Sequence, residues 1–308
     1  MNLYQATAYI KHRLCSRSTA GHGVHSPFIF SLLTTIMRNR SLDEAVRPVE
    51  ELRKEMKKDR KVICVTDLGA SPVRKTGNER RVSEIAGRSA LSKVQVKLLA
   101  RIVQGWFEDG AKVEAKVKAE VEAEVEAEAE AEVKAEVEVE EKSKNGSGSV
   151  RGNDEGVVLE LGTSLGISTL GLALAAPGRK IITVEGCPEL AAIAAQNLEK
   201  YGATNVEVLN MEFSEAIEAI KSRNVKVAFA YIDGNHRGEA MVKYVNSIAA
   251  MGEEMIIVAD DIHLSPDMHN AWNTLTESNN AAATMETRRF GILFKRKSLT
   301  PGRYKIWC

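Results

Sequence analysis

From residue 156 to the C-terminus, apolar runs of strand length alternate with segments of helical spacing. Strands joined by helices pair in parallel through right-handed crossovers, so the pattern predicts an α/β fold with a doubly wound sheet. Residues 283–297 contain two apolar runs with no helix between them, which indicates a closing antiparallel strand, so we expect a seven-stranded, mostly parallel sheet. The strands are expected at 157–162, 180–186, 205–211, 227–234 and 255–261, and the helices at 168–176, 188–202, 214–223, 238–251 and 266–278.

Residues 1–111 are organised differently. Their spacing predicts helices at 4–15, 26–39, 41–59 and 82–107, with one short strand within 61–71 that runs into a turn at Asp67, Gly69 and Ser71. The loop before the second helix carries His22 and His25, which either position the helices or bind a metal. We interpret 1–111 as a helical region that caps a substrate site or mediates oligomerisation.

The charge balance locates an insertion. The chain has 42 basic and 42 acidic residues, yet 112–142 alternates Ala or Val with Glu and has a net charge of −7 from 12 Glu and 5 Lys. Glu side chains four apart repel each other on a helix, and no face of this segment is apolar. We interpret 112–155 as a solvated low-complexity insertion and linker, with an acidic interaction segment as the alternative. Residues 156–308 then form the second domain.

Several classes of protein are disfavoured. The first 15 residues lack the uninterrupted apolar core of a signal peptide, and no apolar run approaches the roughly 18 residues of a membrane span. The four Cys are scattered with no CxxC pair, which argues against a disulfide framework or a structural zinc site. We therefore expect a cytoplasmic protein with no membrane span.

A turn rich in small residues follows the first strand of the second domain. It reads Glu160-Leu-Gly162-Thr163-Ser164-Leu-Gly166 and precedes a helix, at the sheet edge where open α/β folds bind cofactors. A dinucleotide turn needs GxGxxG, whereas positions 162, 164 and 167 are Gly, Ser and Ile. The spacing is closer to a turn that holds S-adenosylmethionine. Glu185 and Gly186 end the second strand, where a carboxylate can accept the hydroxyls of a ribose.

Polar side chains follow the next three strands as well. Asn210, Met211 and Glu212 follow the third strand, where an adenine would lie. Asp233 and His236 follow the fourth strand, and Asp260, Asp261 and His263 follow the fifth. We expect His236 to be the general base, because an imidazole accepts protons near neutral pH, with His263 as the second candidate. The three aspartates could bind magnesium or a similar divalent ion; otherwise they bond loop amides or the cofactor.

These motifs resemble the class I S-adenosylmethionine-dependent methyltransferases. ELGTSLGISTLGLA is similar to their first motif, and YIDGNH and ADDIH are similar to the small-molecule O-methyltransferase branch related to catechol O-methyltransferase. GHGVHSPF and VTDLGAS resemble an uncharacterised bacterial group with an N-terminal helical extension. The resemblance implies a Rossmann-like methyltransferase fold with Asp233 between cofactor and substrate. It also implies that the residues of the glycine turn and Glu185 bind S-adenosylmethionine.

The resulting hypothesis is an enzyme that methylates a small molecule, most simply at oxygen. A nicotinamide-dependent oxidoreductase is the alternative enzyme, and a non-catalytic S-adenosylmethionine-binding scaffold is the alternative without chemistry. Nucleic acid is a disfavoured substrate, because the fourth strand lacks an Asn-Pro-Pro-aromatic sequence and aromatic residues make up only 5% of the chain. A homodimer is compatible with the sequence. The sequence does not identify the methyl acceptor.

Overall fold

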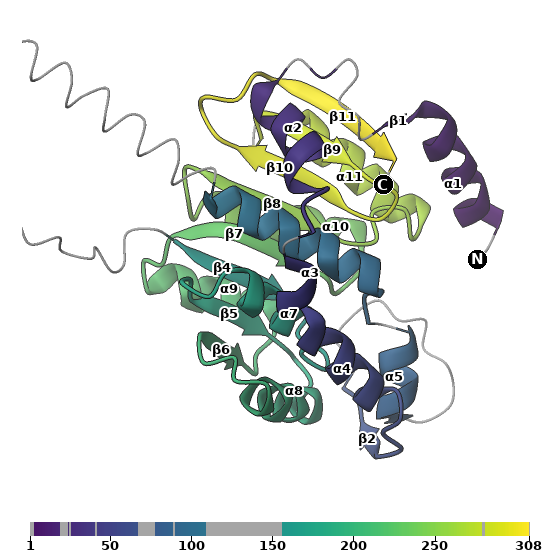
Figure 1. Cartoon of the computed structure of the whole chain (residues 1–308), viewed down its shortest axis with the longest axis vertical. Helices are drawn as coiled ribbons and strands as arrows, with labels where there is room; N and C mark the ends of the chain where they lie inside the picture. Colours follow the sequence, from purple (N-terminus) through teal and green to yellow (C-terminus); the bar gives the residue numbers. More distant parts are fainter. Residues whose placement is uncertain are drawn as a thin grey trace, which may run out of the picture.

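The computed structural model describes residues 3–18, 24, 26–40, 42–66, 78–88, 90–108, 156–278 and 281–307. A twisted sheet has helices on both faces (Figure 1), which confirms the predicted α/β class. None of the helices in these ranges combines the length and apolar character that crossing a bilayer requires. The predictions for His22, His25, Asp67, Gly69, Ser71 and residues 112–142 lie outside the described residues.

Most of the strands lie close to the positions that the sequence predicts. They are β1 (Arg17–Ser18), β2 (Val62–Cys64), β3 (Glu79–Arg81), β4 (Val157–Leu161), β5 (Ile181–Val184), β6 (Val206–Leu209), β7 (Val227–Ile232), β8 (Met255–Ala259), β9 (Ala283–Glu286), β10 (Gly291–Lys295) and β11 (Gly302–Trp307). The main sheet has the order β1-β11-β9-β10-β8-β7-β4-β5-β6. From β6 to β8 all neighbours are parallel. Strand β10 is antiparallel to both β8 and β9.

Two strands extend the sheet beyond the seven that were predicted. The predicted strands correspond to β4 to β10, and β11 and β1 add parallel pairs beyond β9. In β11, Tyr304 and Ile306 are buried, whereas Arg303 and Lys305 are exposed. This alternation is typical of a strand with one face on the core. Through β1, the sheet therefore includes a segment from the N-terminal part of the chain.

The helices are shorter than predicted in the N-terminal part. The predicted helix at 41–59 divides before Pro48, which lies in the first turn of the second piece, where its missing N–H costs no hydrogen bond. The predicted helix at 82–107 also divides, with the second piece at 93–108. The bounds are α1 (Leu3–Cys15), α2 (Pro27–Ser31) with a π-helical turn (Leu32–Ile36), α3 (Leu42–Ala45), α4 (Arg47–Met56), α5 (Val82–Arg88), α7 (Ile167–Ala175), α8 (Pro188–Lys200), α9 (Phe213–Ser222), α10 (Gly238–Ala249) and α11 (Pro266–Glu277).

Each face of the sheet has its own core. Helices α9, α10 and α11 bury one face, which includes Leu161 and Ile257. Helices α7 and α8 cover the other face together with α2, α4 and the helix 93–108, and the buried side chains form one continuous cluster. Gly171 of α7 permits this close packing, because a Cβ there would lie 2.9 Å from Cγ1 of Val96. The N-terminal helices are thus part of the core beneath the sheet.

A small hairpin of β2 and β3 lies beside α8. The backbone N–H of Cys64 donates to Oε1 of Glu189 at 3.1 Å, and the N–H of Thr66 donates to Sγ of Cys187 at 3.4 Å. Cys187 directly follows Glu185 and Gly186, the turn residues after β5. These contacts bring the hairpin to the sheet edge at which β4 and β5 end.

Candidate functional site

A cavity of about 380 Å³ lies at the carboxyl ends of β4, β5, β7 and β8. This size lies in the range of small-molecule sites, which is about 300–1,000 Å³. Nine of the predicted site residues line it: Gly162, Thr163, Ser164, Glu185, Gly186, Glu212, Asp233, His236 and Asp261. The other six do not: Glu160, Gly166, Asn210, Met211, Asp260 and His263.

The glycine turn after β4 fits against the turn after β7. Gly162 has φ +109°, and a Cβ there would lie only 2.0 Å from the carbonyl oxygen of Asp233. The need for glycine therefore arises from the neighbouring turn, whereas the sequence suggested close approach to a ligand. Ser164 has φ +49°, and Gly166, at the start of α7, has φ +78°. These left-handed residues fold the turn tightly enough for its backbone to face the cavity.

Glu160 supports this turn from beneath instead of lining the cavity. It is fully buried, and its Oε2 accepts hydrogen bonds from the hydroxyls of Thr169 at 2.5 Å and Thr183 at 2.6 Å. The hydroxyl of Thr163 lies 2.6 Å from that of Thr183 and extends the network. Burial raises the pKa of Glu160, although these hydroxyl hydrogen bonds oppose the shift. The predicted direct contact of Glu160 with a cofactor is therefore not supported.

Glu185 presents its carboxylate to the cavity in a fixed orientation. Its Oε2 accepts from the N–H of Ser164 at 2.8 Å, and its Oε1 accepts from the N–H of Cys187 at 2.9 Å. Each oxygen keeps one lone pair for a ligand hydroxyl. Burial raises the pKa of Glu185, against the lowering effect of the backbone N–H groups. The Glu185 side chain thus lies on the cavity wall in an orientation that backbone N–H groups hold.

The residues after β6 mostly have structural partners. Asn210 donates through Nδ2 to the carbonyl of Glu185 at 2.7 Å, and Met211 packs against the core under α9 and α10. Glu212 caps α9 by accepting from the N–H groups of Ser214 and Glu215. Of the three residues predicted beside an adenine, only Glu212 lines the cavity, and the neighbouring Phe213 offers an aromatic ring that was not predicted.

The acids after β7 and β8 form a network around Arg289. This arginine makes two contacts with Asp260, one of them from Nη2 to Oδ2 at 2.6 Å, and its Nη2 lies 3.4 Å from Oδ2 of Asp261. The buried hydroxyl of Tyr231 lies 2.9 Å from Oδ2 of Asp260 and 3.1 Å from Oδ2 of Asp233. The cation that compensates these three carboxylates is therefore a side chain of the protein.

The network changes the protonation of its members. Burial and the charge of Asp260 raise the pKa of Asp233 well above its usual value, and Arg289 opposes this effect. The same causes raise the pKa of Asp261. Burial favours loss of the Arg289 proton, yet the hydrogen bond and charge of Asp260 raise the pKa of Arg289 overall. The arginine therefore remains charged and Asp233 holds its proton more tightly than a free aspartate.

This arrangement does not favour the predicted magnesium site. Asp260 is occupied by Arg289 and Tyr231, and Asp261 shares the same arginine. Within the described ranges, the group whose ligand atoms all lie within 4.8 Å of one another is His12, His263 and Glu286, and not the three aspartates. Metal binding by Asp233, Asp260 and Asp261 stays a prediction that these contacts do not support.

The two histidines proposed as bases lie in different places. His236 lines the cavity, and its Nε2 is 3.8 Å from Oδ1 of Asp233. His263 is absent from the cavity wall and its Nε2 lies 3.2 Å from Oε1 of Glu286. The two-residue step from Asp261 to His263 turns the chain away from the cavity, so the structure does not support His263 as a base there.

The outer wall of the cavity comes from the N-terminal region. Thr66 after β2, Arg80 of β3, Glu84 of α5 and Leu91 face the glycine turn across the cavity. Sequence reasoning missed these residues, because no motif marks them and only the packing of distant segments brings them to the site. Arg289 was also missed.

Residues 159–262 match a family model described as a methyltransferase domain. The matched segment runs from within β4 to the turn after β8. No curated protein sequence matches the chain at a significant level.

Solved structures with partial similarity include three bound complexes. Cofactor-bound Rv0187 from MTB is 25% identical over 46% of this chain and 73% of that chain, with a TM-score of 0.38. The methyltransferase PaMTH1 of Podospora anserina, bound to SAH, is 17% identical over 46% and 71%, with a TM-score of 0.39. The O-methyltransferase of Bacillus cereus in complex with SAH is 19% identical over 44% and 71%, with a TM-score of 0.37.

Proposed function

We propose that the protein transfers the methyl group of S-adenosylmethionine to a small-molecule acceptor, at an oxygen atom. The observation that carries the proposal is one cavity with two kinds of residue. The glycine turn and Glu185 lie on one side, and Asp233 and His236 lie where β7 ends. The first set suits a nucleoside, and the second suits an acceptor that must lose a proton. The methyltransferase-domain match over residues 159–262 supports the same reading.

The wall of the cavity fits this cofactor. Glu185 has one free lone pair on each oxygen for the two ribose hydroxyls, and Phe213 provides an apolar surface for a base. The Asp233 carboxyl group lies at the turn after β7, where it would face the methionine portion. The methyl group of the cofactor is bonded to a sulfonium, which makes it a strong electrophile. The protein therefore needs no nucleophilic side chain of its own.

The remaining chemistry falls to positioning and proton removal. His236 faces the cavity and is the group we assign to accept the proton of the acceptor hydroxyl. Asp233 lies 3.8 Å away, and its ionised form would stabilise the resulting imidazolium. Arg289 and Tyr231 hold Asp260 and thereby fix the turn that carries Asp261. These contacts preorganise the site, which is where most of the acceleration of a two-substrate reaction arises.

Three finer proposals accompany this function. Residues 1–111 form the acceptor side of the cavity, which Thr66, Arg80, Glu84 and Leu91 support by lining it. The protein acts in the cytoplasm, in keeping with unpaired Cys15, Cys64 and Cys187 among the described residues. A homodimer remains a proposal for its assembly. Residues 112–155 are proposed to be dispensable for cofactor binding.

Calorimetry with S-adenosylhomocysteine tests the cofactor assignment. We expect saturable binding that weakens at least about 10-fold in Glu185→Gln, because hydrogen bonds to charged groups contribute about 1.5–3 kcal/mol. Glu253→Gln is the matched control, since Glu253 is 83% exposed and pairs with Lys297 far from the cavity. Binding of NADH but not of S-adenosylhomocysteine would replace the proposal with the oxidoreductase alternative.

A tritiated methyl-transfer assay on fractionated metabolites tests the reaction. We expect transfer to a small-molecule fraction, with kcat reduced about 100-fold or more in His236→Ala, since general-base catalysis contributes about 10²–10⁴-fold. The assay is run with and without a chelator, so that it also tests the need for a metal. Cofactor binding without transfer to any fraction would favour the scaffold alternative.

A further inference from the structure

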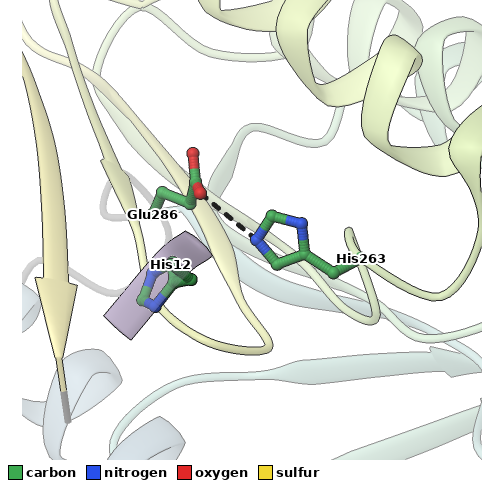
Figure 2. A group of neighbouring side chains, drawn as sticks. All are labelled: His12, His263 and Glu286. Atoms are coloured by element: carbon green, nitrogen blue, oxygen red, sulfur yellow. Dashed lines mark ion pairs between the residues drawn. The ribbon is translucent and has the colours of Figure 1, made fainter. Parts of the chain in front are cut away.

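Three side chains from distant parts of the chain meet behind the cavity. His12 comes from α1, His263 from the turn after β8, and Glu286 from the end of β9 (Figure 2). A ring nitrogen of each histidine and a carboxylate oxygen all lie within 4.8 Å of one another. His12 is 4% exposed and Glu286 is 5% exposed, so water has little access to the group. None of the three residues lines the cofactor cavity.

Several polar atoms in this cluster lack a hydrogen-bond partner in the protein. Oε1 of Glu286 and both ring nitrogens of His263 are buried without a hydrogen bond, and so is Nδ1 of the adjacent His269. His263 Nε2 and Glu286 Oε1 lie 3.2 Å apart and form an ion pair, so each has the other as its partner. Buried polar atoms are nearly always satisfied in folded proteins. A single ion pair is a small set of partners for so many buried polar atoms, and Nδ1 of His263 and of His269 stay unsatisfied, which points to a ligand.

The surrounding contacts orient the candidate ligand atoms. Oε2 of Glu286 accepts from Nε1 of Trp272 at 3.2 Å and lies 3.2 Å from Nζ of Lys305, so Oε1 is the oxygen directed at His263. Ser16 Oγ donates to the His12 carbonyl at 2.5 Å and lies 3.1 Å from Nδ1 and 3.2 Å from Nε2 of the His12 ring. Outer contacts of this kind fix the orientation of metal ligands.

We propose that His12, His263 and Glu286 bind a divalent transition-metal ion of the zinc class. Two imidazole nitrogens and one carboxylate oxygen are a set that zinc accepts, with a fourth position for water. Tetrahedral bonds of about 2.0–2.1 Å place ligand atoms about 3.3–3.5 Å apart. The His263–Glu286 pair already has a 3.2 Å separation, and the His12 nitrogen lies within 4.8 Å of both atoms. The calcium or magnesium class is disfavoured, because these ions prefer oxygen ligands.

The position of the site suggests what the ion does. It joins α1 to two turns of the methyltransferase sheet, residues 260–263 and 286–289. The same two turns supply Asp261 and Arg289 to the cavity wall. The ion therefore acts as a structural link between the N-terminal helix and the back of the cavity. Because it does not touch the cavity, its binding is independent of the proposed methyl transfer.

Metal titration of the untagged full-length protein tests the proposal. The protein is treated with a chelator, dialysed, and titrated with Zn²⁺ by calorimetry and with Co²⁺ by visible absorption. We expect one equivalent of each ion. Glu286→Gln and His263→Ala should each weaken Zn²⁺ binding by more than about 100-fold, since even the loss of an outer contact costs about 10–100-fold. His236→Ala is the matched control, because this histidine lies in the cavity and should leave metal affinity unchanged.

Two results would overturn the inference. The first is a folded wild-type protein that binds no Zn²⁺, which would leave the His263–Glu286 contact at 3.2 Å as the explanation of the cluster. The second is unchanged Zn²⁺ affinity in both Glu286→Gln and His263→Ala. Circular dichroism establishes that each variant is folded, and Glu286→Gln keeps the shape of the side chain. As a further readout, Zn²⁺ should raise the thermal midpoint of the wild type but not that of Glu286→Gln.

Discussion

Replacing Arg289 by Met should expose the cost of the buried acids behind the cavity. The Asp260 side chain is fully buried, and Arg289 makes two contacts with it. Removal of one partner from a buried ion pair costs about 3–5 kcal/mol, because the other charge remains without compensation. The Arg289 side chain is 25% exposed, and Tyr231 and the N–H of Asp261 still donate to Asp260. We therefore expect about 3 kcal/mol, the lower end of this range.

Urea unfolding of the wild type, Arg289→Met, Asp260→Asn and the double variant measures this loss. Asp260→Asn in the Arg289→Met background removes the uncompensated charge, so the double variant should be more stable than Arg289→Met alone. The coupling energy should be about 1–3 kcal/mol. Arg223→Met is a matched control, because that arginine is 47% exposed and pairs with Glu207 on the surface, where ion pairs contribute about 1 kcal/mol or less.

The pH dependence of the same variant provides a second test. Arg289 lowers the pKa of both Asp233 and Asp261 against the effect of burial. Without it, their folded-state pKa values rise further above the unfolded values, so stability is lost as pH rises through the folded values. The deficit of Arg289→Met should therefore be larger at pH 8 than at pH 5. A loss below about 1 kcal/mol at pH 7, or a double variant less stable than Arg289→Met, would refute the reasoning.

Three further changes have defined outcomes. Gly162→Ala should destabilise the protein by more than about 2 kcal/mol in urea unfolding, because its Cβ would lie 2.0 Å from the Asp233 carbonyl, whereas Gly178→Ala, with open space around it, should change stability by less than about 0.5 kcal/mol. In the wild type, the raised pKa of Asp233 makes stability fall as pH rises above about 4, and Asp233→Asn should reduce that slope; an unchanged slope would contradict this. Trp106→Ala, in the core beneath the sheet, should cost about 3–5 kcal/mol, and a change below 1 kcal/mol would show that the N-terminal helices are separable.

The sequence predicts the parallel half of the fold well, because its signal is local. In β8 the run Met255–Ala259 is entirely buried, and such apolar runs between helical segments need no tertiary information to be recognised. The glycine turn and Glu185 are likewise found from their order along the chain. Strand β11 also has a local signal, because buried and exposed residues alternate in 302–307, so period-two spacing identifies it as a strand. Residues whose role depends on how distant strands pair have no such local signal.

Arg289 illustrates what the sequence cannot provide. It lies in a turn between β9 and β10 with no motif around it. Antiparallel pairing sets Gly291 opposite Ala259, and this register brings the residues before Gly291 beside the residues after Ala259. A shift of the register would place Arg289 away from Asp260. The position of Arg289 beside Asp260, where it takes the place of a magnesium ion, therefore depends on the register of a single strand pair.

The direction of β4 has a practical consequence for protein engineering. This strand runs from Val157 toward the cavity, so Gly156 lies at the opposite edge of the sheet. The helix 93–108 ends at the same edge, because the ring of Phe107 lies under the guanidinium of Arg179 just before β5. The connection between them is therefore attached far from the site. We therefore expect that a fluorescent protein or a second enzyme in place of residues 112–142 leaves S-adenosylhomocysteine affinity unchanged, because lengthening a loop costs only about 0.6 kcal/mol for each doubling.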